Sequence, residues 1–152
     1  MKSYIILFLI IFPITLFSQI KKTSNVYKFK NGKYYKVGKV VKQNDWKSTT
    51  LVYKNINGSD ILIGKAYDQK VYAKDNSGNF KEVMSIERDN NSSKFYFFKN
   101  GNLIGKGSWW KNEIYKATGY NFWDGNTFEL AGKIDGGGEN KSLGAGLLLI
   151  YN

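Results

Sequence analysis

Residues 95–133 read FYFFKNGNLIGKGSWWKNEIYKATGYNFWDGNTFELAGK, and this stretch decides the fold class. Asn100-Gly101 and Asp124-Gly125 each lie between apolar or aromatic runs. Such dipeptides are the strongest short-range signal for a β-hairpin, because a type I′ turn needs positive φ at both central residues. The stretch therefore predicts two antiparallel hairpins in succession.

A short unit recurs along the chain: Asn-Gly or Asp-Gly, a few residues, and then an apolar residue followed by Gly-Lys. Its four copies end at Val37-Gly38-Lys39, Ile63-Gly64-Lys65, Ile104-Gly105-Lys106 and Ala131-Gly132-Lys133. Alternation along a strand places the motif glycine on the apolar face in the last three copies and the lysine on the other face. A glycine inside a strand costs stability, so its recurrence predicts that a bulky ring or another backbone packs close to it.

The rest of the chain reads as short strands, and no segment has a sustained helical period. Further strands are expected at residues 26–30, 33–42, 47–54, 60–67, 70–74, 80–88 and 142–151. Residues 80–88 would also suit a short helix, but their alternation favours a strand. The first strand is expected at a sheet edge with Tyr27 and Phe29 inward, and residues 135–141 (DGGGENK) as a mobile loop.

These elements predict an all-β fold with one antiparallel domain of about ten short, hairpin-linked strands. The strands could form an open stack of hairpins, a small barrel or a sandwich. The pattern alone leaves these three arrangements open.

The first eighteen residues have the pattern of a secretory signal peptide. Lys2 gives a positive start, residues 4–17 are almost wholly apolar, and Ser18 is a small residue at the expected cleavage point. Pro13 and the shortness of the run disfavour an uncleaved anchor, which must span ~30 Å of hydrocarbon. We expect cleavage after Ser18, with residues 19–152 exported to the periplasm, the cell surface or the medium.

The chain is strongly basic, with 23 Lys and Arg against 12 Asp and Glu and a formal net charge of +11. This balance favours a polyanionic partner, unless the lysines serve solubility alone. Arg88 is the only arginine, and arginine is the usual residue for bidentate phosphate recognition, which disfavours nucleic acid. A protein, a glycan or an anionic polymer of the cell envelope remain candidate partners, and peripheral contact with a membrane is left open.

Cysteine and histidine are both absent. Their absence excludes disulfides, thiol nucleophiles, thiolate metal sites, Ser-His-Asp triads and imidazole ligands. We therefore expect no cofactor and a non-enzymatic binding or structural module. Asp124 and Glu129, two acids in one aromatic-rich hairpin, leave a carboxylate-based glycan hydrolase as an alternative. The final apolar segment leaves a small outer-membrane β-barrel as another.

Tryptophans and motif lysines are the candidate binding residues. Rings on one face of a sheet stack on sugars or bases, and lysines beside them attract acidic groups. The candidates are Trp109, Trp110, Trp123, Lys65, Lys106 and Lys133. The competing interpretation, which we favour for most of the aromatic residues at 109–123, is that they form the core. Trp109 and Trp110 are adjacent and must point to opposite faces, so one of them is expected outside.

The segments 97–103, 107–112 and 119–122 resemble the MORN-type repeats of bacterial proteins known as YwqK-family antitoxins. Those repeats read aromatic-aromatic-x-Asn-Gly-x-Leu, followed by Gly-x-aromatic. Glu113 stands where the repeat would have glycine, and the spacing between copies is irregular. The resemblance implies stacked hairpins that serve as an interaction surface, and it implies no catalytic residues.

The turn assignment predicts the effect of a single substitution. Gly101→Val would force a β-branched residue to positive φ, which should lower the free energy of unfolding by about 1–3 kcal/mol. Thermal melting of the variant tests this prediction. A melting temperature equal to that of the wild type would mean that residues 100–101 do not form a type I′ turn.

Overall fold

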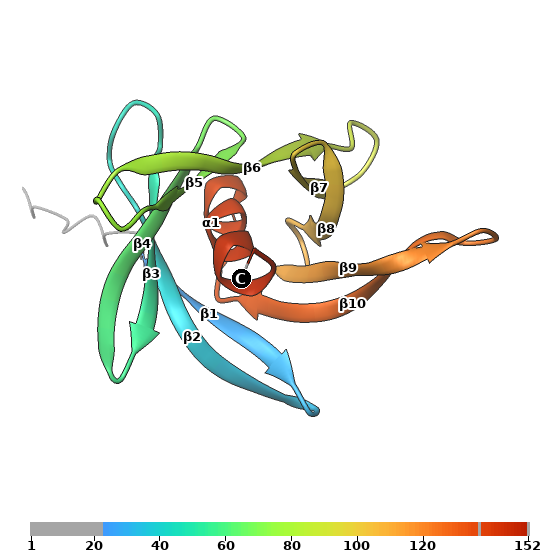
Figure 1. Cartoon of the computed structure of the whole chain (residues 1–152), viewed down its shortest axis with the longest axis horizontal. Coiled ribbons are helices and arrows are strands. Elements are labelled where there is room, and N and C mark those ends of the chain that lie inside the picture. Colours follow the sequence, from blue (N-terminus) through green and yellow to red (C-terminus); the bar gives the residue numbers. More distant parts are fainter. Residues whose placement is uncertain (1–22, 137, 152) are drawn as a thin grey trace, which may run out of the picture.

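The computed structural model describes residues 23–136 and 138–151, and it shows a closed antiparallel barrel with a helix inside (Figure 1). The predicted signal peptide lies outside the described residues. The strands are β1 (Thr23–Lys30), β2 (Lys33–Lys42), β3 (Thr50–Ile56), β4 (Ser59–Tyr67), β5 (Lys70–Lys74), β6 (Phe80–Arg88), β7 (Lys94–Lys99), β8 (Asn102–Ser108), β9 (Glu113–Asn121) and β10 (Gly125–Ile134). The helix is α1 (Glu139–Leu149).

Each strand pairs with its neighbours in sequence, and β1 closes the ring by pairing with β10. The barrel is therefore a ring of five hairpins, β1–β2 to β9–β10, which confirms the all-β fold of about ten hairpin-linked strands. Closure leaves β1 without a free edge. The expected inward positions of Tyr27 and Phe29 are wrong. Val26 is fully buried, so the next residue, Tyr27, lies on the outer face, and Phe29 shares that face by alternation.

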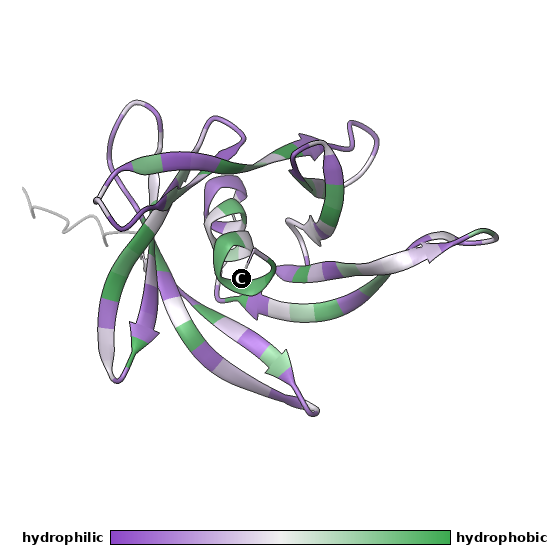
Figure 2. Ribbon diagram, viewed as in Figure 1, coloured by the Kyte–Doolittle hydropathy of each residue, from purple (hydrophilic) through white to green (hydrophobic). Residues whose placement is uncertain are grey.

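Residues 142–151 form no strand, and the prediction of a final β-strand there is wrong. Residues 139–149 form α1, whose residues from Ser142 onward are buried inside the barrel (Figures 1 and 2). A closed barrel offers no edge to an eleventh strand, whereas a helix satisfies its own backbone hydrogen bonds inside an apolar space. The apolar run that suggested a strand therefore fills the lumen.

All five hairpins carry the same β-bulge. In each one, a residue of the second strand has no partner in the first strand: Val37, Ile63, Val83, Ile104 and Ala131. A bulge bends its strand and increases the local twist. Here the unpaired apolar residue and the residue after it both pack towards the core, which strict alternation would not allow.

The bulge explains the apolar-Gly-Lys motif and reveals a copy that the sequence pattern missed. Four bulges are followed by the motif glycines, and in the β5–β6 hairpin Val83 is followed by Met84 and Ser85 instead. The prediction that residues 80–88 form a strand is confirmed. The repeat is therefore fivefold, with one divergent member.

The motif glycines contact the helix, as the close-packing prediction required, although no tryptophan is involved. A methyl group at Gly105 would lie 2.5 Å from the carbonyl oxygen of Tyr115 and 2.8 Å from Cδ1 of Ile150. The other three make equivalent contacts with a tyrosine carbonyl of the next hairpin and a leucine of α1. The pairs are Gly64 with Leu147, Gly38 with Leu148, and Gly132 with Leu149.

Most hairpin turns have the type I′ geometry that the sequence predicts. Asn100 and Gly101 both have positive φ, at 51° and 77°, as a type I′ turn requires, and the turns at residues 31–32 and 57–58 are alike. Gly125 has positive φ but Asp124 does not. There Gly125 pairs with Asn121, so three residues, 122–124, join the strands and the positive φ falls on the first residue of β10. The type I′ prediction for this turn is therefore wrong.

A matched pair of alanine substitutions tests the contact between glycine and helix. Gly105→Ala places a methyl group against backbone and Ile150, so we expect it to lower the free energy of unfolding by about 1–3 kcal/mol. Gly119→Ala meets only the Thr127 hydroxyl, at 3.4 Å, and should change stability little. Chemical denaturation measures both. Equal midpoints for the two variants would contradict the packing of α1 against the barrel wall.

Candidate functional site

A ring of lysines surrounds the outside of the barrel. Each motif lysine lies opposite an aromatic residue of the next hairpin: Lys39 opposite Tyr53, Lys65 opposite Tyr72, Lys106 opposite Tyr115 and Lys133 opposite Tyr27. In the divergent hairpin the pair is Ser85 and Phe98. We call these pairs the outer lysine ring.

The lysines of the outer ring lie over aromatic faces. The ammonium groups of Lys39, Lys65 and Lys106 lie 5.5, 5.7 and 5.8 Å from the ring centroids of their tyrosine partners. Lys133 lies 4.4 Å over Tyr34 instead. Such cation–π contacts contribute roughly 0.5–1 kcal/mol each at exposed positions. Lys39 also forms a 2.9 Å salt bridge with Asp60, so its charge is already matched by a carboxylate.

A groove of about 370 Å³ opens beside Lys106 on the outside of the barrel. Its lining consists of Ser93, Lys94, Lys106, Gly107, Ser108, Lys111, Tyr115 and Phe128. None of these lining residues is acidic. The groove thus combines three ammonium groups, two aromatic rings and the hydroxyls of Ser93 and Ser108, whose oxygens are 3.4 Å apart. We call it the lysine groove.

Aromatic contacts and one nearby carboxylate order the lysine groove. Lys106 Nζ lies 4.0 Å from the ring centroid of Phe128, which fixes this cation at the groove wall. The Tyr115 hydroxyl donates a 2.7 Å hydrogen bond to Oε2 of Glu113. This hydrogen bond raises the pKa of Tyr115 above its usual value, so the phenol stays protonated at neutral pH. The groove therefore presents fixed positive charge and a neutral ring.

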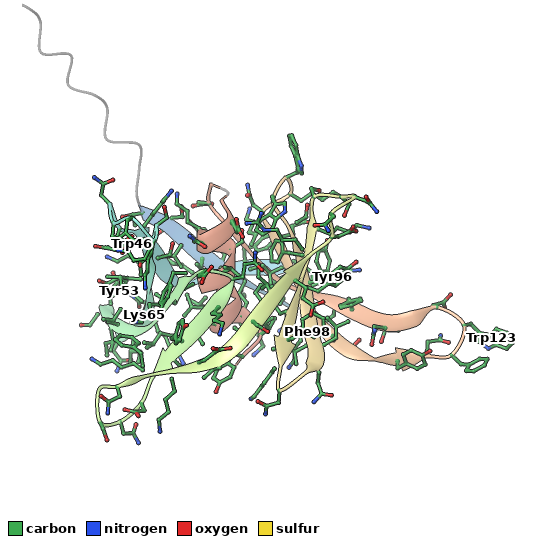
Figure 3. The ribbon with its side chains drawn as sticks, turned by 90° about the horizontal axis from the view of Figure 1, so that it is seen from above. Trp46, Tyr53, Lys65, Tyr96, Phe98 and Trp123 are labelled. Atoms are coloured by element: carbon green, nitrogen blue, oxygen red, sulfur yellow. The ribbon has the colours of Figure 1, made fainter. Side chains whose placement is uncertain are left out.

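The tryptophans occupy different places. Trp109 is partly buried and stacks on Phe95 with ring centroids 4.0 Å apart, whereas Trp110 is 83% exposed in the loop that leads to Lys111. Trp123 is 87% exposed at the tip of the β9–β10 hairpin, far from the barrel body (Figure 3). The expected division between Trp109 and Trp110 is thus observed.

The expectation that most of the aromatic residues at 109–123 form the core is wrong. Trp110, Tyr120, Phe122 and Trp123 are all exposed. The core at this end of the chain comes instead from the leucines of α1, which the sequence pattern assigned to a strand.

The six predicted binding residues do not form one site. Lys106 lines the lysine groove, and Trp110 precedes the groove residue Lys111 in sequence. Lys65 lies at another place on the outer ring, at the opposite end of the molecule from Trp123 in Figure 3. The repeated motif does not predict Lys94, Lys111 and Phe128, because these residues lie outside it. Nor does the motif predict Trp46, which is 90% exposed beside Lys47.

A cluster of aromatic rings lies beside Lys65. Its ammonium is 4.6 Å from the ring centroid of Phe80, and 5.5 and 5.7 Å from those of Tyr67 and Tyr72. The two tyrosine rings stack on each other with centroids 4.8 Å apart. Hydrogen bonding to Tyr67, together with burial, raises the pKa of Tyr72 from 10.0 to about 12. The phenol of Tyr72 therefore remains neutral beside Lys65 across the physiological range.

No family model, curated protein or solved structure matches this chain. The MORN-type resemblance accordingly stays a prediction. Within residues 23–136 and 138–151, no helix is long and apolar enough to cross a membrane.

The raised pKa of Tyr72 predicts how stability depends on pH. The unfolded chain loses this proton near pH 10 and the folded chain near pH 12. The stability linked to this hydroxyl is therefore complete below pH 10 and is lost as the pH rises towards 12.

The ultraviolet absorbance of tyrosinate, recorded as the pH is raised, measures the pKa of Tyr72. The transition near pH 12 should disappear in Tyr72→Phe and move towards 10 in Tyr67→Phe, while Tyr35→Phe, at an exposed tyrosine, should leave it in place. A transition near 12 that persists in Tyr72→Phe would show that another tyrosine is responsible.

Proposed function

We propose that this protein is an exported, non-enzymatic binding module that recognises acidic glycans of the cell envelope through the lysine groove. The observation that carries the proposal is the groove lining, which combines three lysines with aromatic rings and hydroxyls and contains no carboxylate among its residues. Sugar rings stack on aromatic faces, and carboxylate, phosphate or sulfate groups of the glycan would pair with the ammonium groups.

The distribution of cations supports a glycan over nucleic acid. Lysine is a flexible point charge, whereas planar bidentate recognition of phosphate favours arginine. The single arginine, Arg88, is held by Glu139 through a 2.8 Å hydrogen bond from its Nε. Arg88 lies outside the groove lining.

The position of the two candidate catalytic acids supports a non-enzymatic role. Asp124 lies at the hairpin tip, where its Oδ2 accepts a 3.3 Å hydrogen bond from Asn121, and Glu129 lies five residues further along β10. At the usual rise of a strand, their backbones are roughly 16 Å apart. Glycoside hydrolysis needs carboxyl groups about 5–10 Å apart.

The outer lysine ring also argues against a barrel surrounded by lipid. A lysine on the lipid-facing side of a barrel costs about 2–4 kcal/mol at the bilayer midplane. Four such lysines lie around the middle of this barrel. This distribution supports a barrel in water, where the lysines also keep the protein soluble.

Charge removal within and outside the groove tests the proposal. Binding of the wild type to polygalacturonate and to lipopolysaccharide should be stronger than to neutral dextran, and should weaken steeply between low and physiological salt. Lys106→Gln/Lys111→Gln should weaken it by about tenfold or more, since each charged hydrogen bond contributes about 1.5–3 kcal/mol. Lys65→Gln/Lys133→Gln removes equal charge from the outer ring, outside the groove lining, and is the control.

Three outcomes would contradict the proposal. Equal weakening by both double variants would mean that net charge, and not the groove, attracts the polymer. Tighter binding to single-stranded DNA than to either glycan would indicate a nucleic-acid partner. Glycan turnover that is lost in Asp124→Asn or Glu129→Gln would identify an enzyme.

A further inference from the structure

A second ring of lysines surrounds the C-terminal end of α1. In four hairpins the first strand reads apolar, aromatic, lysine: Val26-Tyr27-Lys28, Val52-Tyr53-Lys54, Phe97-Phe98-Lys99 and Ile114-Tyr115-Lys116. Alternate residues of a strand share a face. Each lysine is two residues after a buried apolar residue, so it lies on the same inner face and closer to the hairpin turn. In the third hairpin the same position holds Ala73.

Contacts place all four lysines at the helix end. Lys54 lines a cleft together with Leu147 and Tyr151, while Lys28 and Lys116 line another with Leu149. Lys99 Nζ lies 4.4 Å over the ring of Tyr151. The last turn of α1 has no basic residue of its own. The barrel thus supplies cations where the helix carbonyls carry partial negative charge.

The cleft at Lys54 is the larger of the two, with a volume of about 420 Å³. It opens between the β3–β4 and β5–β6 hairpins because β5 has only five residues and pairs with β4 only from Gly64 to Tyr67. Its floor is apolar and consists of Ile63, Ala73, Val83, Leu147 and Tyr151. Ala73, in place of a ring lysine, leaves this floor uncharged.

The rim of this cleft is basic. Lys54, Lys74 and Lys81 line it, and Asp75 is the only acidic residue among its lining residues. Asp75 accepts hydrogen bonds from the backbone of Ser77 and Asn79 and lies 3.5 Å from Lys81. These contacts hold its pKa below the usual value, so Asp75 stays charged and balances Lys81. The charges of Lys54 and Lys74 are then left unmatched within the lining.

We propose that this cleft binds an anionic amphiphile, with its alkyl chain on the apolar floor and its carboxylate or phosphate between Lys54 and Lys74. Charge complementarity selects the headgroup, and the five apolar floor residues select the chain. Small-molecule sites often occupy barrel mouths and combine an apolar lining with few polar groups. The site is separate from the lysine groove and does not depend on the proposed glycan binding.

Titration calorimetry with short-chain amphiphiles tests the proposal. Dodecanoate should bind with one-to-one stoichiometry, whereas dodecyltrimethylammonium, which has the same chain and the opposite charge, and butyrate, which lacks the chain, should not. Lysophosphatidylglycerol, used below its micellar concentration, compares a phospholipid source of the same chemistry with a free fatty acid. Binding of either anion supports the site.

Two variants locate the ligand, and a third is the control. Lys54→Gln/Lys74→Gln should weaken dodecanoate binding by about tenfold or more. Ala73→Phe, which fills the floor, should abolish it. Lys28→Gln/Lys30→Gln removes two lysines from the second cleft, which has Glu129 and Leu149 in its lining, and should leave binding unchanged. Circular dichroism and thermal melting establish that each variant is folded.

Other outcomes would overturn the proposal. Failure of dodecanoate to bind, with a lower melting temperature in Lys54→Gln/Lys74→Gln, would mean that these lysines serve only the stability of the fold. Equal affinity for the cationic and anionic amphiphiles would show that the lysines do not recognise the headgroup. Unchanged dodecanoate binding by Ala73→Phe would place the ligand elsewhere. Polygalacturonate binding by Ala73→Phe reports on the lysine groove separately.

Discussion

The contact between the end of α1 and the motif glycines is the constraint on which the barrel depends. The interior of an eight-stranded barrel can be filled by its own side chains, but ten strands enclose a wider space. Here α1 fills that space, and four successive residues, Leu147 to Ile150, each contact the glycine of a different hairpin. Successive helical residues point about 100° apart, so the helix end meets the hairpins in turn around the ring.

The β-bulge explains why one short motif serves several purposes. At the bulge, the unpaired apolar residue and the glycine after it both pack inward, and the lysine that follows points outward. The lysine then lies opposite an aromatic residue of the next hairpin, which links neighbouring repeats on the outside. Core packing, helix contact and the outer lysine ring therefore arise from the same three residues. A change at the glycine should disturb all three.

Local features of this fold could be predicted from the sequence, because they depend on residues close together in the chain. The strands, most hairpin turns and four of the five repeats follow from Asn-Gly dipeptides and alternation. The helix could not be predicted, because the apolar run from Leu143 to Ile150 has no period that separates a buried strand from a buried helix. Closure was also unpredictable, since the pairing of β1 with β10 joins residues about a hundred positions apart.

In the candidate sites too, features that depend on nearby residues could be predicted, and those that depend on distant residues could not. The outer lysine ring is visible in the motif, although its aromatic partners lie in the next hairpin and emerge only from strand pairing. The lysine groove needs Lys94 and Phe128, which belong to different hairpins and share no pattern. The inner lysines do recur in the sequence, as apolar-aromatic-Lys. Their position around the C-terminal end of α1 can be seen only in the structure.

The third hairpin shows where this repeated architecture becomes asymmetric. It has Met84 where the others have glycine, Ser85 where they have the outer lysine, and Ala73 where they have the inner lysine. Met84 fills the core position with its own side chain, so this hairpin needs no leucine of α1 against it. Tyr151, the next residue around the helix end, lies beside this hairpin and borders an open cleft. Five identical repeats would surround the helix end with equal charge, and it is the loss of the inner lysine, at Ala73, that gives the barrel mouth an apolar side.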